Sequence, residues 1–462
     1  MSPARLRVSF LLVVTSATLI HLVLGSRLFE ALGISALLLY LLTLGGQLTT
    51  MAKGLLWVAG GVSLLTLWRS PAPAQLLFDA GGRFAFFATF VVALSMLRLP
   101  AYRSRLVRRC GQSMLLQPPS RRYPILSLGS ALFGIILNIG VLNLFASMIE
   151  KSNTLEAAQG RVWVQQARQR RMMLGLLRGF ALAPLISPMG IGVAVVLSSL
   201  PQITWLGLAP YILGAAALIF LVGWAVDFFT GPHPPANQPK PVSPSLRPMV
   251  QFSGLLMAIV TLVFSIAWLC ELRLPIAALL GAPLAAVIWL AWQRRRLGYM
   301  GLPGAFNTLH RQLPWLLSPS ANEIVVLGAA GYLGHLCVGL VDVQQLTPLL
   351  GVLDQWGAFN AVLAMLMVIG LAQVGVNPIV TVTLLLGLLP PLMIEGLSPT
   401  LIGASLMVGW ALALMSSPMT ASMLILSRFT GVPAKLIGYR WNGKFLAACI
   451  PLLAAWFLWS PF

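Results

Sequence analysis

Two Ser-Pro pairs inside long apolar segments are the residues best placed to do chemistry. Ser187-Pro188 and Ser417-Pro418 each interrupt a stretch that is otherwise typical of a membrane span. Proline has no N–H, so it leaves a carbonyl of the preceding turn unpaired. In lipid that carbonyl must bond to a neighbour, a water or an ion. We therefore expect unwound points whose carbonyls and hydroxyls bind a cation or a solute, with Thr420 adding a hydroxyl. The alternative is a kink in which each serine bonds back to its own helix.

The two Ser-Pro pairs lie in matching windows. Residues 179–189 read GFALAPLISPM and residues 409–419 read GWALALMSSPM, with seven of eleven positions identical. Each window follows an apolar segment that is broken by Asn and Gly. This order predicts an internal repeat, with one break in each half.

The Asn and Gly residues before each window are the second set of candidates. They predict tight bends whose helix amino termini point into a cavity and favour an anionic group. An Asn that only caps a turn is the alternative. The bend candidates are Asn138, Gly140 and Asn143 in the first half, and Gly375, Asn377, Pro378 and Thr381 in the second.

Charged candidates are few, because the chain has only 10 Asp and Glu. Glu323 is a possible coupling acid that relays a proton or pairs with a base, unless it is simply solvated at a span end. Arg178 falls inside a span, and snorkelling to the cytoplasmic surface explains it more cheaply than contact with a substrate carboxylate. No catalytic set, metal-ligand spacing or cofactor motif is present, so we predict no enzyme activity, no metal site and no cofactor.

The elements that position these residues are membrane helices. The chain is 58% hydrophobic and 9% charged, and it supplies about eleven apolar segments near the roughly 20 residues that a span needs. The predicted spans are residues 8–24, 29–48, 54–68, 84–97, 173–200, 206–228, 250–270, 275–292, 324–341, 401–426 and 445–459. The fold class is therefore an all-α polytopic membrane protein.

Basic residues indicate that two further apolar segments do not cross. Residues 124–149 have Lys and Arg on both flanks, and basic loops mark the cytoplasmic side. Residues 359–391 have none on either flank, so both flanks are free to lie outside. We predict two re-entrant hairpins that enter from opposite sides, which gives two inverted-topology repeats, a recurrent plan of secondary carriers.

The predicted domain organisation follows from this path. The first repeat is 1–200, with scaffold spans 8–68 and transport elements 84–200. Span six and a Pro-rich cytoplasmic linker occupy 201–249, the rest of the second repeat 250–430, and the final span 431–462. The amino terminus is predicted to be cytoplasmic and the carboxyl terminus periplasmic, in a bacterial inner membrane.

The net charge of +20 does not indicate nucleic-acid binding, because the charges lie in short loops between spans. They are typical of cytoplasmic loops that face anionic lipid. The expected partners are the lipid bilayer and a small-molecule solute.

With hairpins, broken spans and inverted halves, the chain resembles the ion transporter superfamily of secondary carriers, which includes divalent-anion/sodium symporters and the gluconate and dicarboxylate permeases. Ser-Pro-Met and Gly-Val-Asn-Pro stand at the breaks here; Ser-Asn-Thr occurs only at residues 152–154, in a predicted cytoplasmic loop. The resemblance implies an elevator movement of the hairpin-bearing part against a dimeric scaffold, hence a homodimer.

The functional hypothesis is a secondary active transporter of a small anionic organic solute, coupled to Na+ or H+. The alternatives are a membrane-embedded glycolipid or lipid-handling enzyme or flippase, and a membrane assembly subunit that does not transport.

Overall fold

The structure is a computed structural model that describes residues 3–156, 158–231, 244–295, 301–340, 355–388 and 398–459. Within these ranges every regular element is a helix and no strand is found. Ten helical segments of this described part are long and apolar enough to cross a membrane, and α20 is an apolar helix of 17 residues. The predicted all-α polytopic fold is confirmed.

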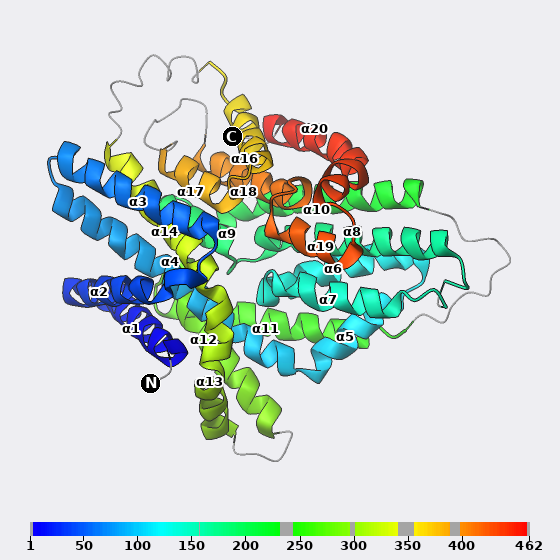
Figure 1. Cartoon of the computed structure of the whole chain (residues 1–462), viewed down its shortest axis with the longest axis horizontal. Helices are drawn as coiled ribbons and strands as arrows, with labels where there is room; N and C mark the ends of the chain where they lie inside the picture. The colour runs from blue at the N-terminus through cyan, green and yellow to red at the C-terminus, as the bar shows by residue number, and fades with distance from the viewer. Residues whose placement is uncertain are drawn as a thin grey trace.

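The helices alternate between long apolar spans and shorter paired segments (Figure 1). The first half contains α1 (Pro3–Leu24), α2 (Arg27–Leu44), η1 (Gly45–Gln47), α3 (Thr50–Arg69), α4 (Pro73–Arg103), α5 (Arg105–Leu115), α6 (Pro119–Leu137), α7 (Gly140–Ser152), α8 (Val162–Ile186), α9 (Ile191–Ser199) and α10 (Trp205–Thr230). The second half contains α11 (Arg247–Leu269), α12 (Leu274–Arg295), α13 (Gly301–Leu317), η2 (Ser318–Ser320), α14 (Ala321–Leu340), α16 (Phe359–Gln373), α17 (Pro378–Leu388), α18 (Pro399–Ser416), α19 (Ala421–Thr430), η5 (Leu436–Trp441) and α20 (Gly443–Trp459).

The fourth predicted span, 84–97, was wrong in length. Helix α4 has 31 residues and continues beyond both Arg83 and Pro100. Arg83 does not end the apolar segment, because its guanidinium donates to the Ser198 carbonyl at 2.9 Å inside the protein. Helices α5 and α13 were missed, because they are amphipathic and each buries only one face.

Helices α4 and α14 pack side by side at the centre of one layer and run antiparallel. A side chain on Gly339, at the end of α14, would meet Leu76 near the start of α4. At the other end, Arg98 of α4 reaches Glu323 in the first turn of α14. An antiparallel orientation is what two inverted repeats require of their equivalent helices.

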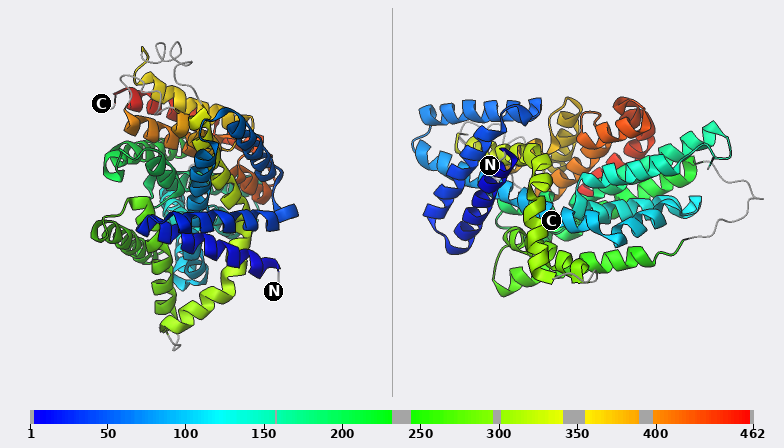
Figure 2. Two further views of the ribbon diagram at one scale, coloured as in Figure 1. Left: turned by 90° about the vertical axis from the view of Figure 1, so that its left-hand side faces the viewer. Right: turned by 60° about the horizontal axis from the view of Figure 1, so that its bottom comes forward.

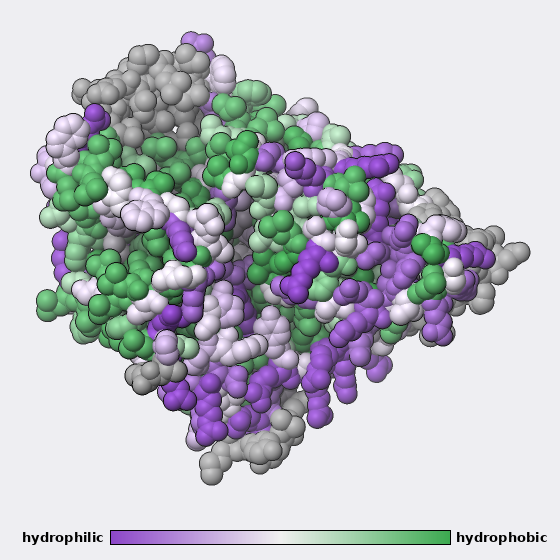
Figure 3. Space-filling view, in the orientation of Figure 1, coloured by the Kyte–Doolittle hydropathy of each residue, from purple (hydrophilic) through white to green (hydrophobic). Residues whose placement is uncertain are grey.

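Helices α1, α2 and α3 cover the outside of this layer, as both views of Figure 2 show. They present bare apolar side chains, including Leu28, Leu42, Trp57 and Trp68, and this side of the molecule is hydrophobic in Figure 3. Hydrophilic side chains gather instead on the side of α5 and α7 (Figure 3). The bare apolar surface is typical of contact with lipid.

The second layer contains the segments that carry the candidate residues. Helices α6 and α7 pack on α8, helices α16 and α17 pack on α18, and α8 packs on α18. Helices α10 and α20 flank this group. The predicted Pro-rich linker falls largely in 232–243, and the last residues of the predicted second hairpin, 389–391, also lie outside the described residues.

Candidate functional site

The two Ser-Pro breaks have nearly the same backbone. Ser187 has φ −92° and ψ 113°, and Ser417 has φ −77° and ψ 124°. Three residues on, Gly190 has φ −77° and ψ 159°, and Thr420 has φ −73° and ψ 147°. Each helix therefore stops and restarts in the same way, so what the repeated sequence encodes is a local unwinding.

Helices α6 and α7 form a tight antiparallel hairpin. Phe133 and Phe145 are 12 positions apart, yet their ring centroids are 5.1 Å from each other, whereas a straight helix would separate them by about 18 Å. The chain reverses at Asn138, which has φ 50° and ψ −136°. Such backbone is unfavourable for a residue with a Cβ.

Each hairpin packs along the broken span of its own half. The first glycine of each matching window lies at the contact between them. A Cβ on Gly179 would collide with the Ser127 backbone of α6, and a Cβ on Gly409 would come within 2.7 Å of the Met365 carbonyl of α16. Further on, Gly134 meets Ala183. These successive contacts make α6 parallel to α8, so that the tip at Asn138 arrives at the level of Ser187.

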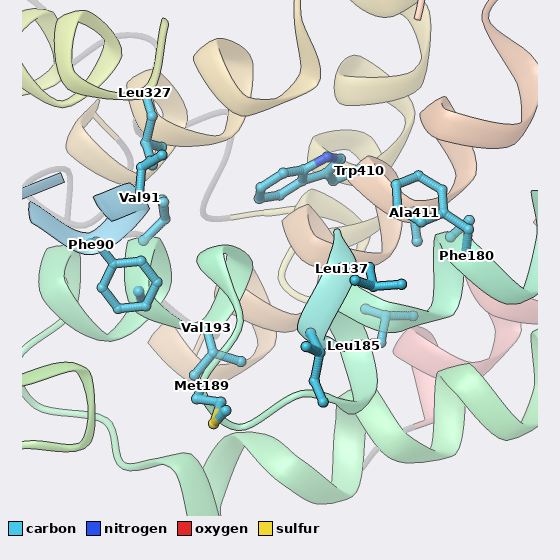
Figure 4. Packing of buried hydrophobic residues seen from close by; sticks show 14 of the residues in the cluster. Phe90, Val91, Leu137, Phe180, Leu185, Met189, Val193, Leu327, Trp410 and Ala411 are labelled. Atoms are coloured by element: carbon cyan, nitrogen blue, oxygen red, sulfur yellow. The ribbon is translucent and has the colours of Figure 1, made fainter. Parts of the chain in front are cut away.

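The two broken spans lie antiparallel. A Cβ on Gly192 of α9 would meet Met407 and Trp410 of α18, and a Cβ on Gly403 would meet Val196. In this register the two breaks are offset along the spans by about one helical turn. Side chains from α6, α8, α9 and α18 lie around the first of them (Figure 4). Helix α7 also contacts α19, and α17 contacts α9, so each hairpin touches the broken span of the other half.

The second break is satisfied internally. Pro418 cannot donate to the Leu414 carbonyl, and the hydroxyl of Ser422 donates to that carbonyl instead, at 2.8 Å. Thr420 Oγ1 donates to the Ser417 carbonyl at 2.9 Å. Ser417 Oγ donates to the Ala372 carbonyl at the tip of the second hairpin, at 2.6 Å. These hydroxyls hold the break and the hairpin together.

The first break is less satisfied. Gly192 and Gly190 stand where the second half has Ser422 and Thr420, so the hydroxyl that replaces the lost bond in the second half has no counterpart at the Pro184 carbonyl. Ser187 Oγ is buried without a hydrogen-bond partner among the described residues. Thr381 Oγ1, on the α17 helix that contacts α9, is also buried without a hydrogen-bond partner among the described residues. Two buried hydroxyls on segments that contact each other are therefore left without a partner in the described structure.

The bend residues play different parts. Asn377 Oδ1 accepts from the Ile379 N–H at 2.9 Å and so caps α17, just before Pro378. Gly375, with φ 97°, turns the chain beside Met419. Gly140 lies against the Tyr102 hydroxyl of α4. Asn143 is exposed on α7, and its side chain has no part in the internal packing.

Glu323 is paired. It accepts from Arg98 at 3.0 Å, and Ser320 also bonds Arg98. Asp227 is held by two bonds from Arg171, at 2.9 and 2.6 Å. Each of these carboxylates is already neutralised by an arginine.

Snorkelling of Arg178 was the wrong expectation. Arg178 is 3% exposed, donates to Asn442 Oδ1 at 3.0 Å, and stacks over the Phe445 ring at 4.3 Å. Asn442 in turn donates to the Met415 carbonyl at 3.0 Å. The arginine thus links α8 to the turn before the second break. Sequence reasoning missed Asn442, and no spacing signal marks it.

The two basic flanks of the first hairpin meet. Burial, and then the charges of Arg168 and Arg171 from the start of α8, lower the pKa of Arg122 at the start of α6 to about 10. The residues before and after the hairpin therefore lie on the same side of the molecule. Among the described residues no group of three His, Cys, Asp or Glu could hold a metal ion.

No protein-family profile and no curated protein matches the sequence. The fold is similar to that of the Alcanivorax borkumensis YdaH transporter, with a TM-score of 0.53 at 15% identity over 88% of this chain and 98% of that one. Neisseria gonorrhoeae MtrF, described as one of a class of antimetabolite efflux pumps, aligns with a TM-score of 0.45 at 13% identity over 84% of this chain and 85% of that one. The chain therefore has a polytopic helical fold like that of a solved transporter.

Proposed function

We propose that this protein is a secondary active transporter that carries a small organic anion across the cytoplasmic membrane. The observation that supports this most is the arrangement of two Ser-Pro breaks and two hairpins along antiparallel broken spans, in which each hairpin contacts both spans. Unwound helices near the middle of a bundle place carbonyls and helix termini where ions and solutes bind. The anion then lies at the amino ends of α9 and α19, where the helix dipole is positive.

We further propose sodium as the coupling ion. The carboxyl end of α8 is the negative end of a helix dipole, and beside it lies the Ser187 hydroxyl, which has no partner in the part of the chain that the structure describes. Neutral oxygen ligands suit sodium, whereas a proton needs a titratable group. We assign Glu323 no part in coupling, because it is already paired with Arg98. Thr381 is the second hydroxyl that we assign to this site.

The re-entrant hairpins, the inverted repeat, the homodimer and the elevator movement belong to this proposal. The antiparallel α4–α14 pair and the parallel course of each hairpin with its broken span support the first two. The movement carries the hairpins and broken spans against the scaffold.

The test is flux into proteoliposomes that contain the full chain. A panel of radiolabelled carboxylates is supplied with a sodium gradient, with a proton gradient, or with neither. We expect uptake of at least one carboxylate that collapses when choline replaces sodium. Uptake driven by the proton gradient alone would refute sodium coupling, and no gradient-driven uptake of any carboxylate would refute the function.

A further inference from the structure

A cavity with several charged side chains in its lining lies at the far end of α9, away from the breaks. It has a volume of about 400 Å³ and lies between α1, α2, α4, α9, α12 and α14. Its size is within the usual range for a small-molecule site. Its charged and titratable lining consists of His21, Glu30, Asp79, Arg83, Arg273 and His335.

Two arginines converge in this cavity on the carboxyl end of α9. Arg83 donates to the Ser198 carbonyl at 2.9 Å, and Arg273 donates to the Leu197 carbonyl. The two guanidinium groups are close enough for their like charges to interact. Neither forms an ion pair within the described ranges. Each guanidinium has five N–H donors, so both keep donors for a ligand.

The acids of the cavity form no ion pair with either arginine in the described structure. Glu30 lies 3.7 Å from the His21 imidazole instead. Asp79 is near enough to act electrostatically on both Arg83 and His335, but it forms no ion pair with either in the described structure. Two guanidinium groups that bond only to neutral carbonyls therefore remain, and paired arginines bind carboxylates strongly, often with two parallel bonds.

The positions of these arginines in the sequence agree with a role in binding. With a cytoplasmic amino terminus, the predicted spans place four basic residues, Arg27, Arg69, Arg83 and Arg273, on the outer side of the membrane or at its edge. Lys and Arg are less frequent on that side than in cytoplasmic loops. Two of the four, Arg83 and Arg273, meet in this cavity, whereas Arg27 and Arg69 are exposed outside it.

We propose that this cavity is a second binding site, specific for a small organic carboxylate that is held between Arg83 and Arg273. This cavity is separate from the proposed site at the breaks. The first break precedes α9 and the cavity lies at its other end, and a helix of nine residues is about 13 Å long. A carboxylate bound here accepts from the guanidinium N–H groups that do not bond to the carbonyls of α9.

The experiment measures binding to the full chain in nanodiscs of neutral phosphatidylcholine by titration calorimetry. The probes are acetate, succinate and citrate, with succinamide as the uncharged analogue of succinate. We expect saturable binding of at least one carboxylate, none of succinamide, and a loss of at least 10-fold in affinity in Arg83→Gln and Arg273→Gln. Arg69→Gln is the matched control and should bind like the wild type.

Two further variants keep the test decisive. Leu22→Trp narrows the cavity from α1 and leaves both arginines unsubstituted, so it should also weaken binding. This variant keeps the proposal testable even if the arginine variants fold poorly. Ser187→Ala should retain this binding, because it alters only the site at the breaks, and the two proposals can thus fail separately. Carboxylate binding that is unchanged in Arg83→Gln and Leu22→Trp, or no saturable binding in the wild type, would overturn the proposal.

Discussion

At the scale of single residues, the two serines of the repeat have the same backbone but different hydrogen bonds. Ser417 holds the tip of the second hairpin through Ala372, whereas Ser187 is buried without a partner in the described structure. An unpaired buried hydroxyl weakens a protein unless a ligand uses it. The first break is thus the better candidate for binding, although the second has more hydroxyls.

Ser187→Ala and Ser417→Ala should therefore have opposite effects. Ser187→Ala removes an unsatisfied group, so the melting temperature without ligand should stay the same or rise, while sodium-driven uptake falls about 10-fold, or ~1.4 kcal/mol. Ser417→Ala should lower the free energy of unfolding by about 1–2 kcal/mol, since it removes the hydroxyl that donates to the Ala372 carbonyl and accepts from the Met419 N–H. Melting curves and flux measured on the same preparations would show both effects. Equal uptake in Ser187→Ala and the wild type would contradict the assignment.

Asn138 offers a test of the hairpin turn. Its φ of 50° suits glycine better than any residue with a Cβ. Asn138→Gly should leave the melting temperature unchanged or raise it, and Asn138→Ala should cost about 1 kcal/mol or more, because Ala tolerates this backbone less well than Asn does. A melting temperature for Asn138→Ala equal to that of Asn138→Gly would mean that the turn does not control stability.

At the scale of elements, one glycine in each half sets the distance between hairpin and broken span. Gly179 touches the Ser127 backbone, and Gly409 touches the Met365 backbone. Backbone atoms cannot rotate away from an added methyl group as a side chain does, so the helices have to separate. These glycines are the first residues of the two matching windows. Close packing of hairpin against broken span therefore explains why both windows begin with glycine.

Gly179→Ala should destabilise the protein by about 1–3 kcal/mol, as overpacking of a tight interface does. Gly175→Ala is the matched control, one turn earlier on the same helix, because its nearest neighbour would be 3.6 Å away. The control should be neutral or slightly stabilising, since alanine favours helix by about 1 kcal/mol over glycine. The melting temperatures of the two variants compare them directly, and similar values would argue against tight α6–α8 packing.

At the scale of the whole molecule, the central prediction is that both flanks of the first hairpin lie in the cytoplasm and both flanks of the second lie outside. Cysteine labelling tests it, after exposed Cys270 is replaced by serine. In inside-out vesicles, an impermeant maleimide should label Arg109→Cys and Trp163→Cys, which are exposed on either side of the first hairpin. Trp356→Cys, before the second hairpin, should be labelled only from the opposite side. Labelling of positions 109 and 163 from different sides would disprove re-entry.

Much of the fold could be predicted from the chain alone. The apolar segments, the bends at Asn138 and Gly375, and the breaks at Ser187 and Ser417 follow from local composition, because proline, glycine and charge act on their own neighbourhood. Helices α5 and α13 were missed for the same reason, since an amphipathic helix gives no strong apolar run. The length of α4 was missed because a partner from α9 satisfies Arg83.

By itself, then, the sequence determined an all-helical membrane protein with repeated breaks, because a bilayer leaves few ways to satisfy a backbone. Only the tertiary structure decided which hydroxyls are free, that Arg178 is buried against Asn442, and that Arg83 and Arg273 share a cavity. The bonded partners of Arg178 and Arg83 lie 264 and 115 positions away in the chain. Contacts over such distances depend on how the helices pack, and no local pattern of residues encodes them.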